Sequence, residues 1–312
     1  VSYWAFDALA NGAVLDAQGT RDGSFYAVHE RAPYIAVDSV PTTSGPAALG
    51  GAPALTFDGS SFAMVEHSQA YETTNQTVAL WVRVDDLGDR QAFVNKDQSG
   101  SDDGGHFRLG QDDGKLFVRI APGNGDRNSS WETREAVLTE GEWAHVAVTF
   151  GTDGVQVYVN GSRLDSGAFR TKEGGQDIDD YKAGFLIAND NPWIIGADTH
   201  RVDDTGTAGV ITTDRDFRDF LDGAVAGVGF WGGYRPEDAL NAEQVLSLAA
   251  NGPGVLGTAF KPDPVPLGDD VINGEGGADT IEAGAGDDQV SGGSEGDLID
   301  AGTLGIGAGL AE

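Results

Sequence analysis

The chain has 312 residues, of which 39% are hydrophobic and 47 are glycines, so we expect a folded protein with many tight turns. Its formal net charge of −31 argues against nucleic acid and anionic membranes as partners, because both would repel it. It contains no cysteine, which fits a cytosolic protein as well as an exported one stabilised by metal ions. No apolar run approaches the roughly 20 residues that span a bilayer, and we expect no membrane insertion.

Residues 1–252 are predicted to form one antiparallel jelly-roll sandwich, and the chain as a whole is expected to be all-β. Short runs of valine, isoleucine and aromatic residues alternate with polar residues, and glycine, aspartate and asparagine separate these runs. Clear examples are TVALWVRV (77–84), KLFVRIA (115–121), EWAHVAVTF (142–150) and GVQVYVNG (154–161). Asp-Gly lies between two such runs in residues 111–115 and again in 152–156, which predicts two hairpins. Many short strands with frequent turns are typical of a sandwich.

An acidic loop at residues 96–105, KDQSGSDDGG, places aspartates and serines at alternate positions, as an EF-hand calcium loop does. Its sixth position is Asp102, where glycine is required, and its twelfth is Arg108, where glutamate is required. We therefore expect a solvated loop here.

Two tryptophans differ from the others in their surroundings. Trp131 and Trp193 lie in polar segments, beside Arg134 and Asn191 respectively, and an exposed indole next to such groups can stack on a sugar ring. The alternative is that each indole closes one end of the sandwich. The remaining tryptophans lie in apolar strand patterns and are predicted to be core residues: Trp4, Trp81, Trp143 and Trp231. His145 is expected to be structural, and the five histidines show no zinc motif.

A single helix is predicted at residues 241–252, where Asn241 can cap the first turn, Gln244 follows three residues later and Gly252 ends it. The next residues, 253–264, are rich in proline and glycine and are interpreted as a linker. Beyond Lys261 the chain has no basic residue, and its negative charge is denser than in the preceding domain.

The residues 265–302 are periodic, with four successive repeats of nine beginning at residues 265, 274, 283 and 292. The sixth position is always aspartate: Asp270, Asp279, Asp288 and Asp297. The eighth is always a branched aliphatic residue: Ile272, Ile281, Val290 and Ile299. Glycine is frequent in the first four positions, including Gly268, Gly277 and Gly286 at the fourth. A flexible linker would have no reason to keep isoleucine and valine in register.

This spacing predicts a parallel β-roll that binds calcium. Each repeat would form one tight turn and one short strand, with the aliphatic side chain inside and the carboxylates and turn carbonyls around Ca²⁺. Because successive turns lie on alternate sides of a roll, Asp270 is expected to pair with Asp288, and Asp279 with Asp297. Without metal, the charge density should keep this region disordered.

The four repeats resemble the GGxGxDx-aliphatic-x pattern of the RTX (repeats-in-toxin) family. The resemblance implies calcium binding and export by a one-step, type I-like bacterial route with an uncleaved C-terminal signal, so that an extracellular or cell-surface location is expected. The departures are Glu275 and Glu295 at glycine positions, a degenerate first repeat and an array of only four turns. Two calcium ions are therefore expected, and the tail 303–312 is short for a complete secretion signal.

The larger domain resembles the laminin-G-like group of concanavalin-A-like lectin/glucanase sandwiches over about residues 3–252. The segments that carry the resemblance, in order, are LTFDGSSFAMVE (55–66), TVALWVRV (77–84), residues 93–120, residues 141–167, NPWIIGAD (191–198) and residues 220–252. It implies two curved sheets, a structural Ca²⁺ in some members and a face that binds glycans or proteins. By resemblance, Asp58 and Asp222 are candidate ligands of such a calcium ion, and a turn-forming Asp-Gly is the competing account for each.

The sequence shows no complete catalytic set. The carboxylate-rich segment 176–181 lacks the alternation of a glucanase strand, and YKAGF (181–185) matches the alginate-lyase motif Tyr-x-Lys-Ala-Gly incompletely, since Tyr181 and Lys182 are adjacent. Catalysis is left open. We expect a secreted, calcium-binding protein with a lectin-like module for an extracellular polysaccharide or surface glycan. The alternatives are a polysaccharide-degrading enzyme on the same fold and a structural subunit of an extracellular layer or fibre.

Overall fold

The computed structural model describes residues 2–10, 13–17, 21–27, 34–36, 40–96, 106–121, 129–181, 191–199, 210–211, 217–233, 235–253, 271–273, 280–282, 289–291 and 298–300. The chain divides into two compact units, Val1–Phe260 and Lys261–Glu312. The boundary falls within the segment 253–264 that the sequence suggests as a linker. The exact limits of that linker and of the tail 303–312 stay predictions.

The first unit contains most of the secondary structure, and nearly all of it is β. Its strands are β1 (Ser2–Ala10), β2 (Ala13–Asp16), β3 (Gly23–Ala27), β4 (Tyr34–Ala36), β5 (Thr42–Ser44), β6 (Pro53–Asp58), β7 (Ser61–Val65), β8 (Asn75–Val84), β9 (Gln91–Lys96), β10 (His106–Asp112), β11 (Lys115–Ala121), β12 (Ser129–Thr133), β13 (Trp143–Gly151), β14 (Gly154–Val159), β15 (Ser162–Arg163), β16 (Phe169–Glu173), β17 (Trp193–Ile195), β18 (Val210–Ile211) and β19 (Asp222–Gly233). The α-helix is α1 (Ala242–Asn251), and the short 3₁₀ turns are η1 (Ala47–Leu49), η2 (Gln69–Tyr71), η3 (Ser166–Ala168), η4 (Ile178–Asp180) and η5 (Pro236–Asp238). Within the described part of the chain, no helix is long and apolar enough to cross a membrane.

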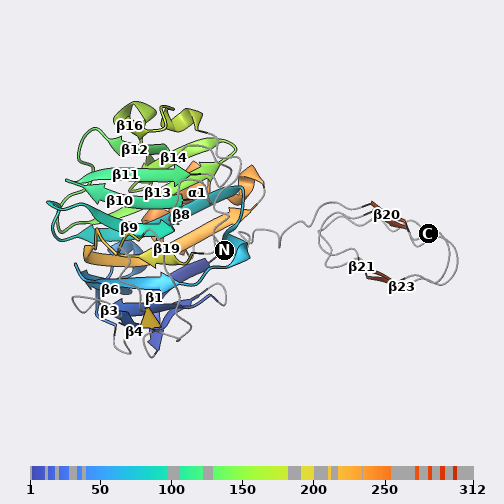
Figure 1. Cartoon of the computed structure of the whole chain (residues 1–312), viewed down its shortest axis with the longest axis horizontal. Helices are drawn as coiled ribbons and strands as arrows, with labels where there is room; N and C mark the ends of the chain where they lie inside the picture. The colour runs from blue at the N-terminus through green and yellow to red at the C-terminus, as the bar shows by residue number, and fades with distance from the viewer. Residues whose placement is uncertain are drawn as a thin grey trace. The chain divides into compact units, whose positions relative to one another are not determined.

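These strands form two antiparallel sheets, which we call the first and the second sheet. The first sheet runs β15–β14–β13–β8–β19, and β19 then pairs with both β6 and β1 along its other edge. The second sheet runs β16–β12–β11–β10–β9–β17–β7–β3–β4–β18 (Figure 1). A short pairing of β2 with β3 joins the two sheets at one edge. The predicted all-β jelly-roll sandwich is confirmed.

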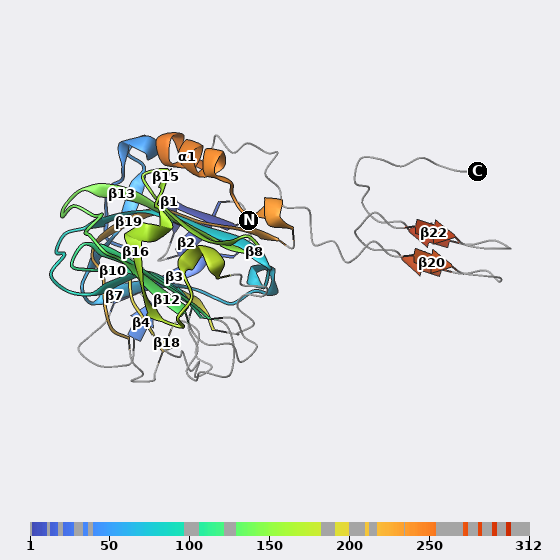
Figure 2. The same cartoon turned by 90° about the horizontal axis from the view of Figure 1, so that it is seen from above.

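The main hydrophobic core lies between the two sheets, because alternate residues of each strand face inward. Strand β8 shows this clearly. Its residues Val78, Leu80 and Val82 belong to the main core, whereas Ala79 and Trp81 belong to a second cluster on the other side of the sheet. That second cluster includes residues of α1, so α1 packs against the outer face of the first sheet (Figure 2). Small alanines under the helix allow it to approach the sheet closely.

Local sequence signals explain most element boundaries. The four predicted strands correspond to β8, β11, β13 and β14, and both Asp-Gly segments form hairpins, one of which places Asp113 and Gly114 at positive φ.

In α1, the side chain of Asn241 accepts a hydrogen bond from the backbone N–H of Gln244, and the side chain of Gln244 accepts one from the backbone N–H of Asn241. Gly252 ends the helix at positive φ. The predicted helix is therefore confirmed.

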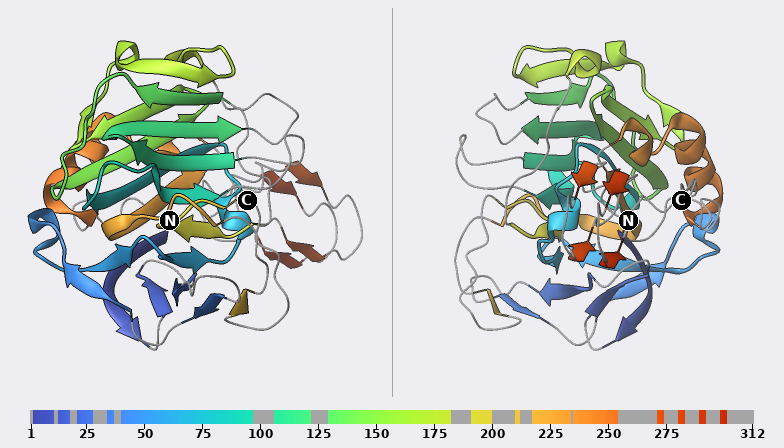
Figure 3. Two further views of the ribbon diagram at one scale, coloured as in Figure 1. Left: turned by 60° about the vertical axis from the view of Figure 1, so that its left-hand side comes forward. Right: turned by 90° about the vertical axis from the view of Figure 1, so that its right-hand side faces the viewer.

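The second unit contains four strands of three residues each: β20 (Val271–Asn273), β21 (Thr280–Glu282), β22 (Gln289–Ser291) and β23 (Leu298–Asp300). They form two separate parallel ladders, β20 with β22 and β21 with β23, visible as two pairs in Figure 3. The partners Ile272 with Val290, and Ile281 with Ile299, are two repeats apart. Successive repeats thus alternate between the two ladders, as the nine-residue period predicts.

Candidate functional site

The structure contradicts the prediction that Trp131 and Trp193 are exposed. Trp131 is 1% exposed and Trp193 is 3% exposed, and both belong to the main core. The indole Nε1 of Trp131 donates to the carbonyl of Gln176 at 2.9 Å, and its ring meets Tyr181 edge-on. Neither indole can stack on a sugar in this position, so the predicted sugar-stacking role of both is wrong.

The physical reason is the alternation of β12. Its neighbours in sequence are polar because Ser130 and Glu132 point away from the core, while Trp131 and Thr133 point into it. The polar residues that predict a loop here are therefore the outward-facing residues of a strand. Trp193 begins the short strand β17, which lies between β7 and β9 and is buried there.

Because both indoles are buried, the two polar residues predicted beside them, Arg134 and Asn191, do not flank an exposed aromatic ring. Arg134 is exposed, and its Nε donates to the carbonyl of Gly167 at 3.1 Å. Asn191 is half-buried, and its carbonyl accepts a hydrogen bond from Lys96. Their roles as ligand contacts stay predictions without support from the indoles.

The other aromatic predictions are confirmed, with one difference. Trp4, Trp81 and Trp231 are buried core residues, whereas Trp143 is only partly buried and packs at the rim of the second cluster. His145 lies against Trp81 with ring centroids 4.6 Å apart, and neither ring nitrogen has a hydrogen-bond partner. Burial lowers the pKa of His145 to about 3, so this histidine is neutral and structural at pH 7.

The two sheets differ in what covers their outer faces. The first is covered by α1 and apolar side chains, whereas the second presents charged and amide groups on β9, β10, β11, β12 and β16 and the segments beside them. We call this surface the arginine face. Its members are Arg90, Asn95, Arg108, Phe117, Arg119, Glu132, Arg170, Lys172, Glu173, Asp198, Arg218 and Asp219.

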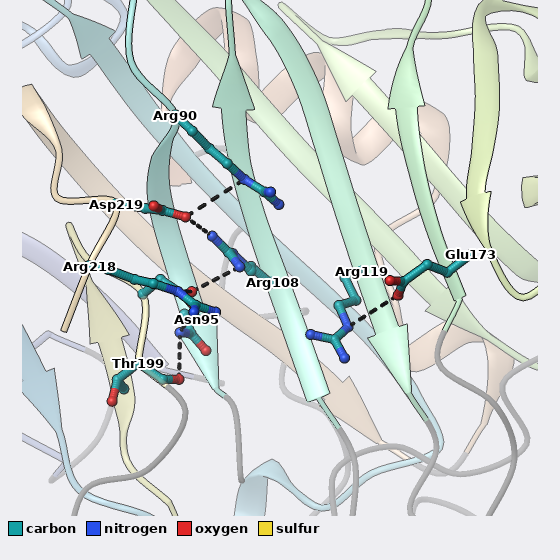
Figure 4. A network of polar contacts seen from close by, with 9 residues as sticks. Arg90, Asn95, Arg108, Arg119, Glu173, Thr199, Arg218 and Asp219 are labelled. Atoms are coloured by element: carbon teal, nitrogen blue, oxygen red, sulfur yellow. Dashed lines mark hydrogen bonds and ion pairs between the residues drawn. The ribbon is translucent and has the colours of Figure 1, made fainter. Parts of the chain in front are cut away.

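A chain of alternating charges organises one half of the arginine face (Figure 4). Arg108 is buried, and it is held by Asp198, at 2.8 Å from Nη1 to Oδ2, and by Asp219. Asp198 also pairs with Arg218 at 2.8 Å, and Asp219 lies 3.6 Å from Arg90. The order is therefore Arg90–Asp219–Arg108–Asp198–Arg218, with a half-exposed arginine at each end.

Further contacts fix this chain of charges on the sheet. Asn95 donates to Asp198 at 2.6 Å and to the carbonyl of Thr199 at 3.1 Å. The guanidinium groups of Arg90 and Arg108 lie over the ring of Phe117, at 4.3 and 4.9 Å from its centroid. Burial lowers the pKa of Arg108 while Asp198 opposes the shift, and the guanidinium remains charged at any ordinary pH.

The other half of the arginine face lies across β11, β12 and β16. Arg119 on β11 lies opposite Arg108 on β10, and its Nε is 4.0 Å from Glu173. Glu132 accepts hydrogen bonds from Arg170 and lies 3.3 Å from Lys172. Burial raises the pKa of Glu132, but the two basic partners outweigh it and lower the pKa below its usual value.

Sequence reasoning missed the arginine face, although a signal was present. Arg108 and Arg119 each lie between apolar residues in strands β10 and β11, at the positions that face away from the core. Strict alternation assigns both arginines to the same side of the sheet. The partners Asp198 and Asp219 come from distant segments, and their convergence required the fold.

The two candidate calcium ligands of the sandwich are neighbours. Asp58 and Asp222 are opposite one another on β6 and β19. Burial tends to raise the pKa of Asp58, but hydrogen bonds from Ser60 and Ser61 outweigh it, and the pKa is lowered. Burial and neighbouring carboxylates, Asp85 first among them, raise the pKa of Asp222.

These contacts support the turn-forming account of Asp58. Among the residues that the structure describes, no group of three or more acidic, histidine or cysteine residues could hold a metal ion. A calcium ion at Asp58 and Asp222 therefore stays a prediction from resemblance.

The proposed calcium ligands of the repeats lie outside the described residues: Asp270, Asp279, Asp288, Asp297, Gly268, Gly277 and Gly286. What the structure does describe is the strand that directly follows each of those aspartates in the sequence. The two-repeat register of these strands is the spacing that the expected aspartate pairs require. Carboxylates and turn carbonyls are oxygen donors of the kind Ca²⁺ prefers, so the residues present fit this ion.

The candidate catalytic segments lie partly within the described residues. Residues 176–181 contain the 3₁₀ turn η4 and no strand, so its carboxylates do not share one strand face, and Tyr181 is buried in the core. Lys182 and most of the acidic loop 96–105 lie outside the described residues.

Comparison with known proteins identifies both units. Residues 57–245 match the family model Laminin_G_3 of the concanavalin A-like lectin/glucanases superfamily. Residues 267–299 match the RTX calcium-binding nonapeptide repeat in four copies. No curated protein shows significant similarity to the chain.

Three solved structures illustrate the similar folds. Domain 4 of the extracellular arabinanase AbnA from Geobacillus stearothermophilus, in complex with arabinotriose, is 16% identical with a TM-score of 0.47, covering 80% of this chain and 97% of that one. A sialidase from Trypanosoma rangeli is 14% identical with a TM-score of 0.45, covering 81% and 33%. The botulinum neurotoxin serotype D binding domain is 12% identical with a TM-score of 0.45, covering 80% and 50%.

The Laminin_G_3 match covers more than half of the chain and spans the central strands of both sheets. The four repeats follow it in the sequence, in the order that the residue patterns predict. The chain therefore belongs to the concanavalin A-like lectin/glucanases superfamily and carries calcium-binding RTX nonapeptide repeats after its laminin-G-like sandwich.

Proposed function

We propose that this protein is an exported, calcium-stabilised carbohydrate-binding module that works in adhesion or in recognition of an extracellular polysaccharide or surface glycan. The sandwich binds the glycan through the arginine face. The repeats bind calcium through their aspartates and fold after export by a type I-like route, at the cell surface or outside the cell.

The observation that carries this proposal is the difference between the two outer faces of the sandwich. The outer face of the first sheet is largely covered by α1 and apolar side chains. The second sheet holds amide, guanidinium and carboxylate groups on paired strands, and several of these side chains are half exposed. Rigidly held polar groups on a broad surface suit an extended chain of hydroxyl-bearing sugars.

Glu132, a carboxylate of the arginine face, gives no support to a hydrolase mechanism. A glycosidase needs one carboxyl group that stays protonated near neutral pH, which requires a raised pKa. Glu132 has a lowered pKa because of Arg170 and Lys172. Binding is therefore the function that these groups favour.

A panel of immobilised polysaccharides tests the proposal with the full chain, once in calcium and once in EDTA. We expect retention on at least one class of glycan in calcium. Absence of retention on every acidic and neutral polysaccharide would overturn the binding function. Release of reducing or unsaturated ends during the same incubations would replace it with the enzymatic alternative, and calcium-dependent ordered assembly of the protein alone would favour a structural subunit.

A further inference from the structure

A cavity of about 290 Å³ lies on the outer face of the first sheet. Its walls come from η1 and α1, and from Trp81 on β8 and Trp143 and His145 on β13. The strand register explains why these side chains meet, because His145 is opposite Trp81, and Trp143 is opposite Arg83, across the two strands. Alternate residues of a strand share one side of a sheet, so these side chains all point away from the main core.

His145 brings an unpaired polar group to this cavity. The residue is only 2% exposed, and neither Nδ1 nor Nε2 has a hydrogen-bond partner among the described residues. Its backbone is fixed by the turn at Asn160, whose Oδ1 accepts from the N–H of His145 at 2.9 Å and whose N–H donates to the carbonyl of His145 at 2.7 Å. An imidazole that packs on Trp81 with both nitrogens unpaired lowers stability, and a ligand that pairs with one nitrogen would relieve this.

The cavity reaches the protein surface at α1. Leu246 lines the cavity and is 54% exposed, and among the described residues it is the one large hydrophobic side chain classed as exposed. The turn at Gly161 keeps this part of the helix close to the sheet, since a Cβ at Gly161 would lie 2.9 Å from the Cα of Leu246. A lone exposed leucine is ordinary on a protein surface, but beside an apolar cavity it gives an apolar ligand a path of entry.

The lining favours a ligand without charge. The described residues around the cavity are mainly alanines, a proline, a leucine and two indoles, and none of them is acidic. Burial alone lowers the pKa of His145, so no described charged group acts on its imidazole, which is neutral at pH 7. Arg83 lies over the ring of Trp143, 5.6 Å from its centroid, but does not line the cavity. Ions and sugars with many hydroxyl groups would lose more hydration than this lining can replace.

The size of the cavity favours a single ring. An apolar cavity of roughly 150 Å³ takes up benzene, and pockets for larger ligands begin at about 300 Å³. The cavity beside His145 can therefore enclose one substituted ring but not several sugar units. Aromatic rings also pack favourably on indoles, in stacked or edge-on arrangements.

We propose that this cavity binds a small neutral phenol, a single aromatic ring that carries one hydroxyl group. The ring lies against Trp143 and the alanines of α1, and the hydroxyl donates a hydrogen bond to an imidazole nitrogen of His145. A phenol has one O–H donor, and a neutral imidazole has one nitrogen that accepts. The site lies on the other sheet from the arginine face, so phenol binding and the proposed glycan binding can succeed or fail separately.

The test compares probes of similar shape by calorimetry, with the full chain at constant calcium. Toluene lacks the hydroxyl group of para-cresol, para-methylanisole cannot donate a hydrogen bond, and para-toluate carries a negative charge. We expect para-cresol to bind about tenfold or more tightly than toluene and para-methylanisole, because only para-cresol pairs with the buried imidazole. Para-toluate should bind most weakly, since no described basic group in the cavity offsets its loss of hydration.

The variant His145→Phe tests the hydrogen bond. It keeps an aromatic ring but removes both nitrogens, so the preference for para-cresol over toluene should disappear. In the unmodified protein, nitrogen resonances of the imidazole, assigned by their absence from the spectrum of His145→Phe, should shift when para-cresol is added and stay in place with toluene.

The variant Ala250→Phe tests the position of the site. Ala250 is an exposed residue of α1 that lines the cavity, and a phenyl group there should weaken binding of every neutral probe about tenfold or more. The matched control is Ala242→Phe, because Ala242 is an exposed alanine of the same helix that does not line this cavity. The control should bind para-cresol as the unmodified protein does, and equal melting temperatures would show that both variants are folded.

Four results would overturn the inference. Failure of all neutral probes to bind would mean that the cavity holds only solvent. Equal affinities for para-cresol and toluene would show that the imidazole is not recognised. Tighter binding of para-toluate would refute the neutral ligand, and undiminished binding in a folded Ala250→Phe protein would place the site elsewhere. Retention on polysaccharides tests the proposed function and does not depend on any of these outcomes.

Discussion

The sandwich and the nonapeptide repeats are both built from β-strands, but their strands differ greatly in length and in the way they pair. Strand β8 alone contributes valines and a leucine to one core and a tryptophan to another, within a layered antiparallel structure. Each strand of the repeats has three residues, with one aliphatic side chain at its centre. The comparison teaches that strands of three residues need more than their own ladders to be stable, and we expect the calcium bound by these repeats to be that further source of stability.

The largest expected effect is the removal of calcium. With EDTA, the region 265–302 should lose its ladders, because its dense negative charge is then uncompensated, while the sandwich keeps its core. Hydrogen exchange measured peptide by peptide checks both the loss of the ladders and the retention of the sandwich core. Protection of β20–β23 that persists in EDTA would show that the repeats fold without metal. The repeats would then not differ from the sandwich in their need for calcium.

Core truncation should act on the sandwich alone. Trp131→Ala is expected to cost about 3–5 kcal/mol of unfolding free energy, since it removes a buried indole from the main core. Calcium affinity of the repeats should not change. The milder Trp131→Phe tests whether this indole is only a core residue: the variant should keep glycan binding, and a loss of binding in a stably folded Trp131→Phe protein would return this indole to the ligand site.

Acid should destabilise the sandwich through His145. The pKa of its imidazole is about 3 in the folded chain against about 6.5 unfolded, so between these values only the unfolded chain binds the proton. The destabilisation is absent above pH 6.5 and grows by about 1.4 kcal/mol per pH unit as the pH falls toward 3.

Replacing His145 by phenylalanine separates this effect from that of the carboxylates. Because neither ring nitrogen has a partner, His145→Phe should be tolerated at pH 7 and should flatten the pH dependence of stability below 6.5. Denaturant unfolding of both proteins at several pH values measures the difference. Identical slopes would mean that His145 becomes protonated without unfolding.

The smallest effect is expected from the replacement of single calcium ligands. It tests which aspartates of the repeats share an ion. If Asp270 and Asp288 share an ion, the variants Asp270→Asn and Asp288→Asn should be strongly non-additive in calcium affinity. Asp270→Asn combined with Asp297→Asn should be nearly additive. Calcium titrations of the single and double variants check this, and the reverse pattern would exclude the eighteen-residue pairing.

Much of the fold could be predicted from the sequence, because its signals are local. Alternation gave β8, β11, β13 and β14, Asp-Gly gave two hairpins, and Asn241 with Gln244 gave the start of α1. The alternation of repeats between two ladders also followed from their period.

The candidate site was less accessible to sequence reasoning. Trp131 was misplaced because the outward residues of β12 are polar, which resembles a loop when the strand is short. The arginine face depends on Asp198 and Asp219 meeting Arg108 from distant parts of the chain. Such convergence has no signature in any single segment.

The position of β8 at the centre of the first sheet has a consequence for how the chain folds. One of its neighbours, β19, comes far later in the sequence, so the pairing on that side must wait for most of the chain to be available. Until then, a ten-residue segment of high β-propensity has an unprotected edge, which favours intermolecular pairing. Folding yield at rising protein concentration should therefore depend on how soon β19 reaches β8, and charged substitutions at the outward Arg83 end of β8 offer a direct way to vary that competition.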